Sequence, residues 1–256
     1  MKVTLLQTDI QWAAVDANIR RADELLARHA GSDLYVLPEM WSTGFATEPQ
    51  GIALPESENP AKAWMQQTAQ AHRCAVCGSL AVVDGDGTFR NRSYFCTPEG
   101  VSHYDKHHLF SYGHEDRFYT AGNGRTVVEY GGWRFLLVTC YDLRFPVWSR
   151  YTQEQPFDAI VVVANWPESR QTAWRVLTQA RAIENQAYLI GVNRVGDDPY
   201  SHYVGESVVV SPRGDIVSRC QQTEQALTVD LDLDKLRTMR ERFRVLNDAD
   251  RFTLHL

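Results

Sequence analysis

Long apolar runs are missing from this sequence of 256 residues, and their absence limits where the protein can act. The longest aliphatic stretch, residues 159–164, is far shorter than the roughly 18 residues that a helix needs to cross a bilayer. The N-terminal stretch MKVTLLQTDIQW reaches polar residues too early for a secretory signal. We therefore expect a cytoplasmic protein without a membrane partner.

Cysteine and basic residues are also scarce. The five cysteines are an odd and sparse set in a long chain, which fits free thiols better than a disulfide framework. The 26 Lys and Arg residues are outnumbered by 32 Asp and Glu residues, which gives a net charge of -6. Binding to nucleic-acid phosphates requires a basic excess, so we expect no nucleic-acid partner.

What is present is typical of one large α/β domain covering residues 1–256. The composition, 44% hydrophobic and 23% charged, is ordinary for a globular chain and supplies a sizeable core. Short β-rich runs alternate with segments whose apolar residues recur every three or four positions. We expect strands at residues 3–8, 34–37, 74–83, 92–97, 134–139, 159–164, 188–193 and 207–211, and helices at 17–28, 61–71, 172–186 and 234–243. The run Asp84-Gly85-Asp86-Gly87 predicts a hairpin, so part of the sheet should be antiparallel.

The first segment that could carry chemistry is Leu37-Pro38-Glu39-Met40. Pro38 removes a ladder donor at the end of an apolar run, which places Glu39 just beyond a strand. Proteins of the α/β class commonly use such positions for functional side chains. Read alone, Glu39 also fits an ordinary carboxylate at the start of a surface loop.

A second segment, Tyr104-Asp105-Lys106-His107-His108, is cationic and lies between aromatic residues. Lys106 alone also fits a solvated surface lysine. The adjacent histidines raise the question of a metal, but consecutive side chains of a strand point to opposite faces. Since no cysteine or carboxylate stands at a customary zinc spacing, we assign no metal site.

In the third segment an apolar strand runs directly into Cys140. We expect a turn after the cysteine and a helix that begins at Phe145-Pro146, which in outline is a nucleophile elbow. Backbone N–H groups at such a turn, including that of Tyr141, would stabilise a thiolate and later an oxyanion. A buried structural thiol is the alternative that this segment leaves open.

Together these segments resemble the carbon–nitrogen hydrolase (nitrilase) superfamily. Leu-Pro-Glu39-Met, Tyr-Asp-Lys106 and Thr-Cys140-Tyr-Asp-Leu-Arg-Phe-Pro occur in the order typical of that family. The accompanying blocks are His114-Glu115, Asn165-Trp166-Pro167 and Arg181-Ala-Ile-Glu184-Asn185. The resemblance covers residues 2–235. Within the family the sequence resembles the Nit-type branch, and most of all its bacterial omega-amidases, which share the motif Cys-Tyr-Asp-Leu-Arg-Phe-Pro-Val-Trp-Ser-Arg.

The resemblance implies a four-layer αββα sandwich of the nitrilase type and a catalytic triad of Glu39, Lys106 and Cys140. It also implies a homodimer or a higher homo-oligomer, no cofactor, and a supporting role for Glu115 beside Lys106. For an omega-amidase the substrate is a small anionic amide, the monoamide of an oxo-dicarboxylic acid such as 2-oxoglutaramate or 2-oxosuccinamate. The backbone N–H of Tyr141 would help to hold the oxyanion.

Substrate contacts are expected from Phe45, Trp166 and Arg170. The guanidinium of Arg170 suits the remote carboxylate of such a substrate, although an exposed arginine before a helix fits the same position. The two aromatic residues would form walls of the pocket, or would simply complete the core. Other charges have structural explanations: Asp142 with Arg144 as an ion pair at the elbow, and Arg181 with Glu184 as an i,i+3 helix pair.

Several other functions are compatible with parts of the sequence. Within the superfamily these are aliphatic amide, nitrile and N-carbamoyl hydrolysis, which use the same triad. Outside it, His107 or His108 could serve as the base of a Cys–His hydrolase. Cys74 and Cys77 suggest a redox or metal site, but positions three apart on a strand face opposite sides. A non-catalytic interaction module that retains the fold is the remaining class.

Overall fold

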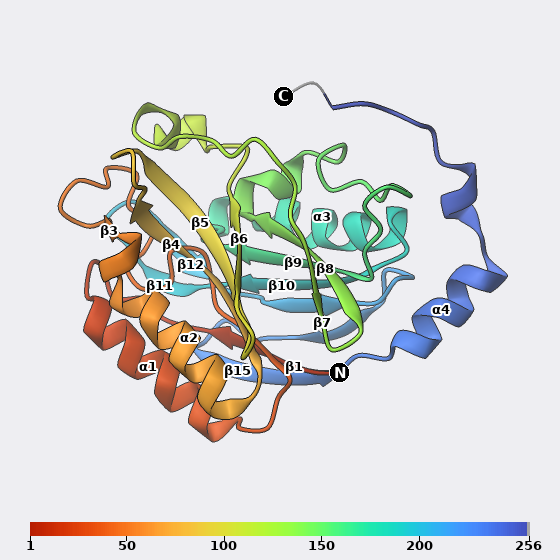
Figure 1. Cartoon of the computed structure of the whole chain (residues 1–256), viewed down its shortest axis with the longest axis horizontal. Helices are drawn as coiled ribbons and strands as arrows, with labels where there is room; N and C mark the ends of the chain where they lie inside the picture. The colour runs from red at the N-terminus through yellow and green to blue at the C-terminus, as the bar shows by residue number, and fades with distance from the viewer. Residues whose placement is uncertain (255–256) are drawn as a thin grey trace.

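Two mixed β-sheets form the centre of the molecule (Figure 1), which is described here for residues 1–254 of a computed structural model. The first sheet has the order β15-β1-β2-β4-β5-β6, with β3 beside β4. Its strands are β1 (Lys2–Gln7), β2 (Leu34–Val36), β3 (Leu54–Pro55), β4 (Ala75–Val83), β5 (Phe89–Cys96), β6 (Val101–Asp105) and β15 (Gln225–Asp230).

The second sheet has the order β14-β13-β10-β9-β8-β7. Its strands are β7 (Val127–Tyr130), β8 (Trp133–Thr139), β9 (Ala159–Ala164), β10 (Tyr188–Asn193), β13 (Val208–Val210) and β14 (Ile216–Arg219). A separate two-stranded ribbon joins β11 (Val195–Asp197) to β12 (His202–Val204). The parallel strands β8, β9 and β10 all end at the same edge, which is where open α/β sheets place their sites.

Helices cover the outer faces of both sheets (Figure 1). Helices α1 (Val15–Arg28) and α2 (Pro60–His72) pack on the first sheet, and α3 (Gln171–Glu184) packs on the second. Helix α1 buries Ala22, Leu25 and Leu26, which share one face at the three- and four-residue spacing seen in the sequence. The predicted four-layer αββα sandwich is thereby confirmed. Helix α4 (Leu233–Arg242) follows β15.

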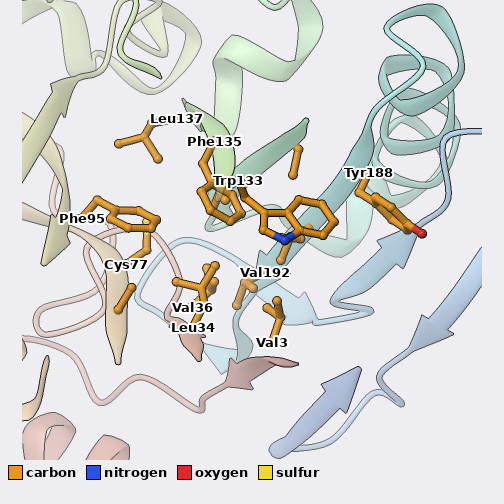
Figure 2. Packing of buried hydrophobic residues seen from close by; sticks show 14 of the residues in the cluster. Val3, Leu34, Val36, Cys77, Phe95, Trp133, Phe135, Leu137, Tyr188 and Val192 are labelled. Carbon is orange, nitrogen blue, oxygen red and sulfur yellow. The ribbon is translucent and has the colours of Figure 1, made fainter. Parts of the chain in front are cut away.

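The main core lies between the two sheets (Figure 2). Phe95 and Val36 from the first sheet pack there with Phe135, Trp133 and Val192 from the second. Strand β9 also contributes its alternate residues to the layer between the second sheet and α3, so its apolar run is buried on both faces. Each such aliphatic side chain stabilises the fold by about 1.5–3 kcal/mol.

The predicted hairpin is confirmed, whereas several polar strands were missed. Strands β4 and β5 pair antiparallel around Asp84–Thr88, with Gly87 at φ 81. The strands absent from the expectation include β6, β7, β14 and β15, whose sequences show little continuous apolar character. Strand β15 forms because its backbone pairs with β1 over six residues, not because its side chains are apolar. Within the described residues no helix is long and apolar enough to cross a membrane.

Candidate active site

Residues that follow strands of both sheets meet at one place. Glu39 lies three residues beyond β2, Cys140 directly follows β8, and Asn165 directly follows β9. The backbone N–H of Asn165 donates to Glu39 Oε2 at 2.9 Å, which joins the two sheets at this edge. The surface-loop alternative for Glu39 is wrong, because its side chain is completely buried.

Lys106 lies between two buried carboxylates. Its Nζ donates to Glu39 Oε1 and to Glu115 Oε2, both at 2.8 Å, and all three side chains are fully buried. The solvated-lysine alternative is therefore wrong. Burial by itself disfavours the ammonium, but Glu115 and Glu39 outweigh it and raise the pKa of Lys106 above its ordinary value. Burial, with the charge of Glu39, raises the pKa of Glu115 although Lys106 opposes this shift.

Asn91 on β5 completes this cluster and was not predicted. Its Nδ2 donates to Glu39 Oε1 at 2.8 Å and to Glu115 Oε1 at 3.0 Å. The sequence offers no signal that separates Asn91 from its polar neighbours Arg90 and Arg92. Only the pairing of β5 with β4 and β6 brings it between the two glutamates.

Cys140 begins a short 3-10 helix, Cys140–Arg144, in a left-handed conformation with φ 44. A positive φ is unfavourable for a residue with a Cβ and marks a position held by its surroundings. The Sγ atom lies 3.8 Å from the carbonyl oxygen of Asn165. Burial, followed by the charge of Glu39, raises the pKa of the thiol, and Lys106 opposes the shift. A thiol whose pKa is raised would need a base beside it to act as a nucleophile.

Two expectations about the elbow were wrong. The helix expected at Phe145-Pro146 is absent; the 3-10 helix precedes it, and residues 146–149 form turns. The expected ion pair of Asp142 with Arg144 does not form either. Asp142 instead accepts hydrogen bonds from Tyr104 Oη at 2.7 Å and from the backbone N–H of Thr139 at 3.1 Å. The carboxylate therefore anchors the turn that carries Cys140. The expected Arg181–Glu184 pair is present at 3.1 Å.

The two histidines occupy a bend after β6, so the assumption that they sit on a strand was wrong. His107 stacks on Trp148 with 3.9 Å between ring centroids, and His108 stacks on Phe145 at 3.7 Å. The Nδ1 of His108 lies 2.8 Å from Asp142 Oδ1. These contacts leave the histidines in structural positions and disfavour the Cys–His hydrolase. Among residues 1–254 no three His, Cys, Asp or Glu side chains are grouped to hold a metal ion.

The other cysteines lie in apolar surroundings. Cys74 belongs to the layer beneath the helices and Cys77 to the core between the sheets, so they face opposite sides of the first sheet. Burial raises the pKa of Cys74 to about 11. The redox or metal interpretation of this pair therefore has no structural support.

A cavity of about 490 Å³ opens onto Cys140 and Lys106. The predicted contact residues Phe45, Tyr141, Trp166 and Arg170 all line it. Arg144, which the sequence assigned to an ion pair, also lines the cavity. Its guanidinium lies 4.9 Å from the ring centroid of Trp166, and that of Arg170 lies 5.0 Å from the ring centroid of Phe110. A further wall, which no sequence pattern predicted, comes from four residues of the ribbon β11–β12 and its connecting turn: Asp198, Tyr200, Ser201 and Tyr203.

Fold and site together define a class: an αββα sandwich in which a thiol lies beside a buried carboxylate–ammonium cluster, as in the nitrilase-type hydrolases. Comparison with known families agrees, because the carbon-nitrogen hydrolase model matches residues 2–241. The chain belongs to this family, and the resemblance drawn from its motifs is confirmed.

Individual relatives cover the whole chain. The omega-amidase YafV of Yersinia enterocolitica is 44% identical over 257 residues, which cover 99% of this chain and 98% of that protein. The 2-oxoglutaramate amidase of Bacillus subtilis is 31% identical, with 96% of each chain covered. XC1258 of Xanthomonas campestris, a CN-hydrolase superfamily protein whose crystal structure holds an arsenic adduct in the active site, is 37% identical with a TM-score of 0.95 and covers 100% of this chain and 99% of its own. The predicted fold is confirmed by this likeness.

Proposed function

We propose that this protein is an omega-amidase that hydrolyses the terminal amide of small oxo-dicarboxylic acid monoamides, 2-oxoglutaramate or 2-oxosuccinamate, to the acid and ammonia. The observation that carries the proposal is a single cavity that holds the Cys140 thiol and Lys106 together with Arg144 and Arg170. A thiol beside a base suits acyl transfer, and two guanidinium groups suit an anionic substrate. The omega-amidase and 2-oxoglutaramate amidase names of the relatives support the same activity.

Acylation begins at Cys140. Because the pKa of its thiol is raised, proton transfer to Glu39 accompanies attack of sulfur on the amide carbon. The C–S bond forms as the carbonyl π pair moves to oxygen, which gives a tetrahedral oxyanion. The backbone N–H of Tyr141 and the ammonium of Lys106 would stabilise this charge, each by about 3–4 kcal/mol.

Collapse of the intermediate breaks the C–N bond. Glu39 returns its proton to the departing nitrogen, so ammonia leaves and a thioester remains on Cys140. Water then attacks the thioester while Glu39 accepts its proton, and that proton passes to the departing sulfur. One carboxylate thus acts as base, acid, base and acid in turn. Glu115, hydrogen bonded to Lys106, holds the ammonium in place.

The remote carboxylate of the substrate would bind Arg144 and Arg170, and Phe45 and Trp166 would flank its carbon chain. A neutral aliphatic nitrile or amide would leave both arginines without an anionic partner, which makes aliphatic nitrile and amide hydrolysis less suited to this cavity. The testing experiment is an ammonia-release assay of oxo-acid monoamides, aliphatic amides, nitriles and N-carbamoyl amino acids. Hydrolysis of the neutral substrates with equal kcat/KM would overturn the omega-amidase assignment and leave the family assignment intact.

We also propose one catalytic domain that works as a homodimer or a higher homo-oligomer. Strand β15 pairs with β1 at the edge of the first sheet, so segments that are far apart in the sequence share one sheet, which supports a single unit for residues 1–254. Residues 255 and 256 of the predicted domain lie outside the described part. Val176 and Ile183 are 58% and 51% exposed, seven residues apart on α3, which supports an intersubunit contact there. Light scattering after size exclusion tests the oligomer, and a monomeric mass at micromolar concentration would refute it.

A further inference from the structure

We propose that Asn91, hydrogen bonded to Ser79, is a positioning residue that keeps Glu39 and Glu115 aligned and ionised around Lys106. This inference deepens the proposed function and rests on its assignment of Glu39 as the base. Asn91 is absent from the wall of the cavity, so it acts through the glutamates and not on the substrate.

The hydrogen bonds of Glu39 divide its two oxygens into different roles. Oε1 accepts from Lys106 Nζ and from Asn91 Nδ2, both at 2.8 Å. Oε2 accepts only the backbone N–H of Asn165 among the described contacts, at 2.9 Å. Two donors thus occupy Oε1, and Oε2 keeps a lone pair for the proton of Cys140. Asn91 thereby fixes which carboxylate oxygen works as the base.

The two carboxylates determine which way the amide of Asn91 points, and Ser79 supports that orientation. A reversed amide would place its carbonyl oxygen against two anionic groups, so the NH₂ group faces Glu39 and Glu115. The Ser79 hydroxyl accepts the backbone N–H of Met40 and donates to Asn91 Oδ1, both at 2.9 Å. Ser79 therefore supplies a donor to the amide oxygen that points away from the glutamates.

Charge explains why two donors are needed here. The ionisable groups that face Glu39 are Lys106, Glu115, Cys140 and Tyr119. Burial raises the pKa of Tyr119 well above its ordinary value, so it stays neutral, as does the resting thiol. One ammonium then balances two carboxylates. The N–H groups of Asn91 offset the second negative charge, and their loss would favour protonation of Glu115, whose pKa burial already raises, and would remove one of the donors that hold Glu39.

The test measures inactivation of Cys140 by iodoacetamide between pH 4 and 9, beside kcat/KM for 2-oxoglutaramate. Asn91→Leu keeps the side-chain size but removes both donors. We expect the acidic limb of both profiles to move up by about one pH unit, since a hydrogen bond to an ionised group changes the protonation equilibrium by roughly that much. Loss of alignment of the base should in addition lower the plateau value of kcat by about 10- to 100-fold.

Three further variants separate positioning from a loss of folding. Ser79→Ala leaves Asn91 Oδ1 without this donor, so the amide is held less firmly, and the acidic limb should move in the same direction by a smaller amount. Asn91→Asp adds a third carboxylate and should move the acidic limb of the pH profile further than Asn91→Leu does. The matched control, Ser93→Ala on the same face of β5, removes a buried hydroxyl that pairs with Thr139 at 2.8 Å and should leave the midpoint unmoved.

Unchanged midpoints in Asn91→Leu and Ser79→Ala, with only a lower melting temperature, would overturn the inference. An equal shift in Ser93→Ala would overturn it as well. Iodoacetamide reports on Cys140 without the proposed substrate being present. The role of Asn91 and the substrate assignment can therefore be refuted independently of each other. A shifted alkylation profile in a protein that rejects 2-oxoglutaramate would retain the role of Asn91 and reject only the substrate.

Discussion

Asn165 donates hydrogen bonds to both the side chain and the backbone of Glu39: its backbone N–H donates to Oε2 at 2.9 Å, and its Nδ2 donates to the backbone carbonyl at 2.6 Å. Glu39 belongs to the first sheet and Asn165 to the second. The carbonyl of Asn165 also lies beside the Cys140 thiol. The proposed base and the proposed nucleophile therefore follow strands of different sheets, and the packing between the sheets aligns them.

Cys140 should be the only cysteine that reacts and the only one required for turnover. Electrophile labelling followed by peptide mass mapping should find the adduct there, since the cavity reaches this thiol. Burial raises the pKa of Cys96 and of Cys220 to about 12, and unlike Cys140 neither thiol lines the cavity, so both should stay unreactive at neutral pH. Full activity in Cys140→Ala would contradict the nucleophile assignment, and Cys220→Ala serves as the matched control.

Lys106→Met should lower the acylation rate by about 100-fold or more, because it removes a charge that stabilises the oxyanion. It also leaves Glu39 and Glu115 buried without a counterion, at a cost to folding of about 3–5 kcal/mol. The double variant Lys106→Met/Glu115→Gln removes one negative charge and should recover most of the lost stability without recovering activity. Recovery of both, measured by thermal melts and single-turnover kinetics, would show that Lys106 is only structural.

The remote carboxylate should matter to catalysis through Arg144 and Arg170. Replacing it by a methyl ester should lower kcat/KM by about 10- to 1000-fold, because charged donors lose their partner. Arg170→Met and Arg144→Met should each erase much of this preference while slow hydrolysis of the ester persists. Arg213→Met, at an exposed turn away from the cavity, is the control. If either cavity variant keeps the full preference, that arginine does not bind the carboxylate.

Asp142→Asn should impair the elbow more than it impairs the fold. The carboxylate accepts hydrogen bonds from Tyr104, His108 and Thr139, and an amide presents a donor where one of them needs an acceptor. We expect kcat to fall by about 10-fold or more as Cys140 leaves its left-handed conformation. Wild-type kcat with a reduced melting temperature would assign Asp142 to stability alone.

Glu206 should contribute stability that disappears in acid. Hydrogen bonds from Arg175, opposed by burial, lower the pKa of Glu206 from 4.5 to about 2. A lowered folded-state pKa means that the contribution is complete above pH 4.5 and is lost as the pH falls toward about 2. The difference in melting temperature between wild type and Glu206→Gln should therefore be large at pH 7 and shrink between pH 4.5 and 2. A difference that does not change with pH would contradict the shift.

Sequence patterns predicted the elements with strong internal signals. Strand β9 is a continuous apolar run, and α1 repeats its apolar residues at helical spacing, so local side chains alone identify both. Strand β15 was missed because β1 supplies the hydrogen bonds that extend it. The prediction of a helix after Cys140 was wrong because the hydrogen bond from the backbone N–H of Thr139 to Asp142 holds the chain in a tighter turn at that point.

Ordered motifs and local periodicity in the sequence were sufficient to predict the family and the layered α/β fold, and to select Glu39, Lys106 and Cys140 as candidate site residues. The surroundings of these three residues depend on how the two sheets pack. Asn91 lies between two glutamates because strand pairing places it there, and Arg144 faces the cavity because Asp142 is bound elsewhere. Contacts between residues distant in the chain leave no periodic trace in the sequence, so their partners become known only once the sheets are packed.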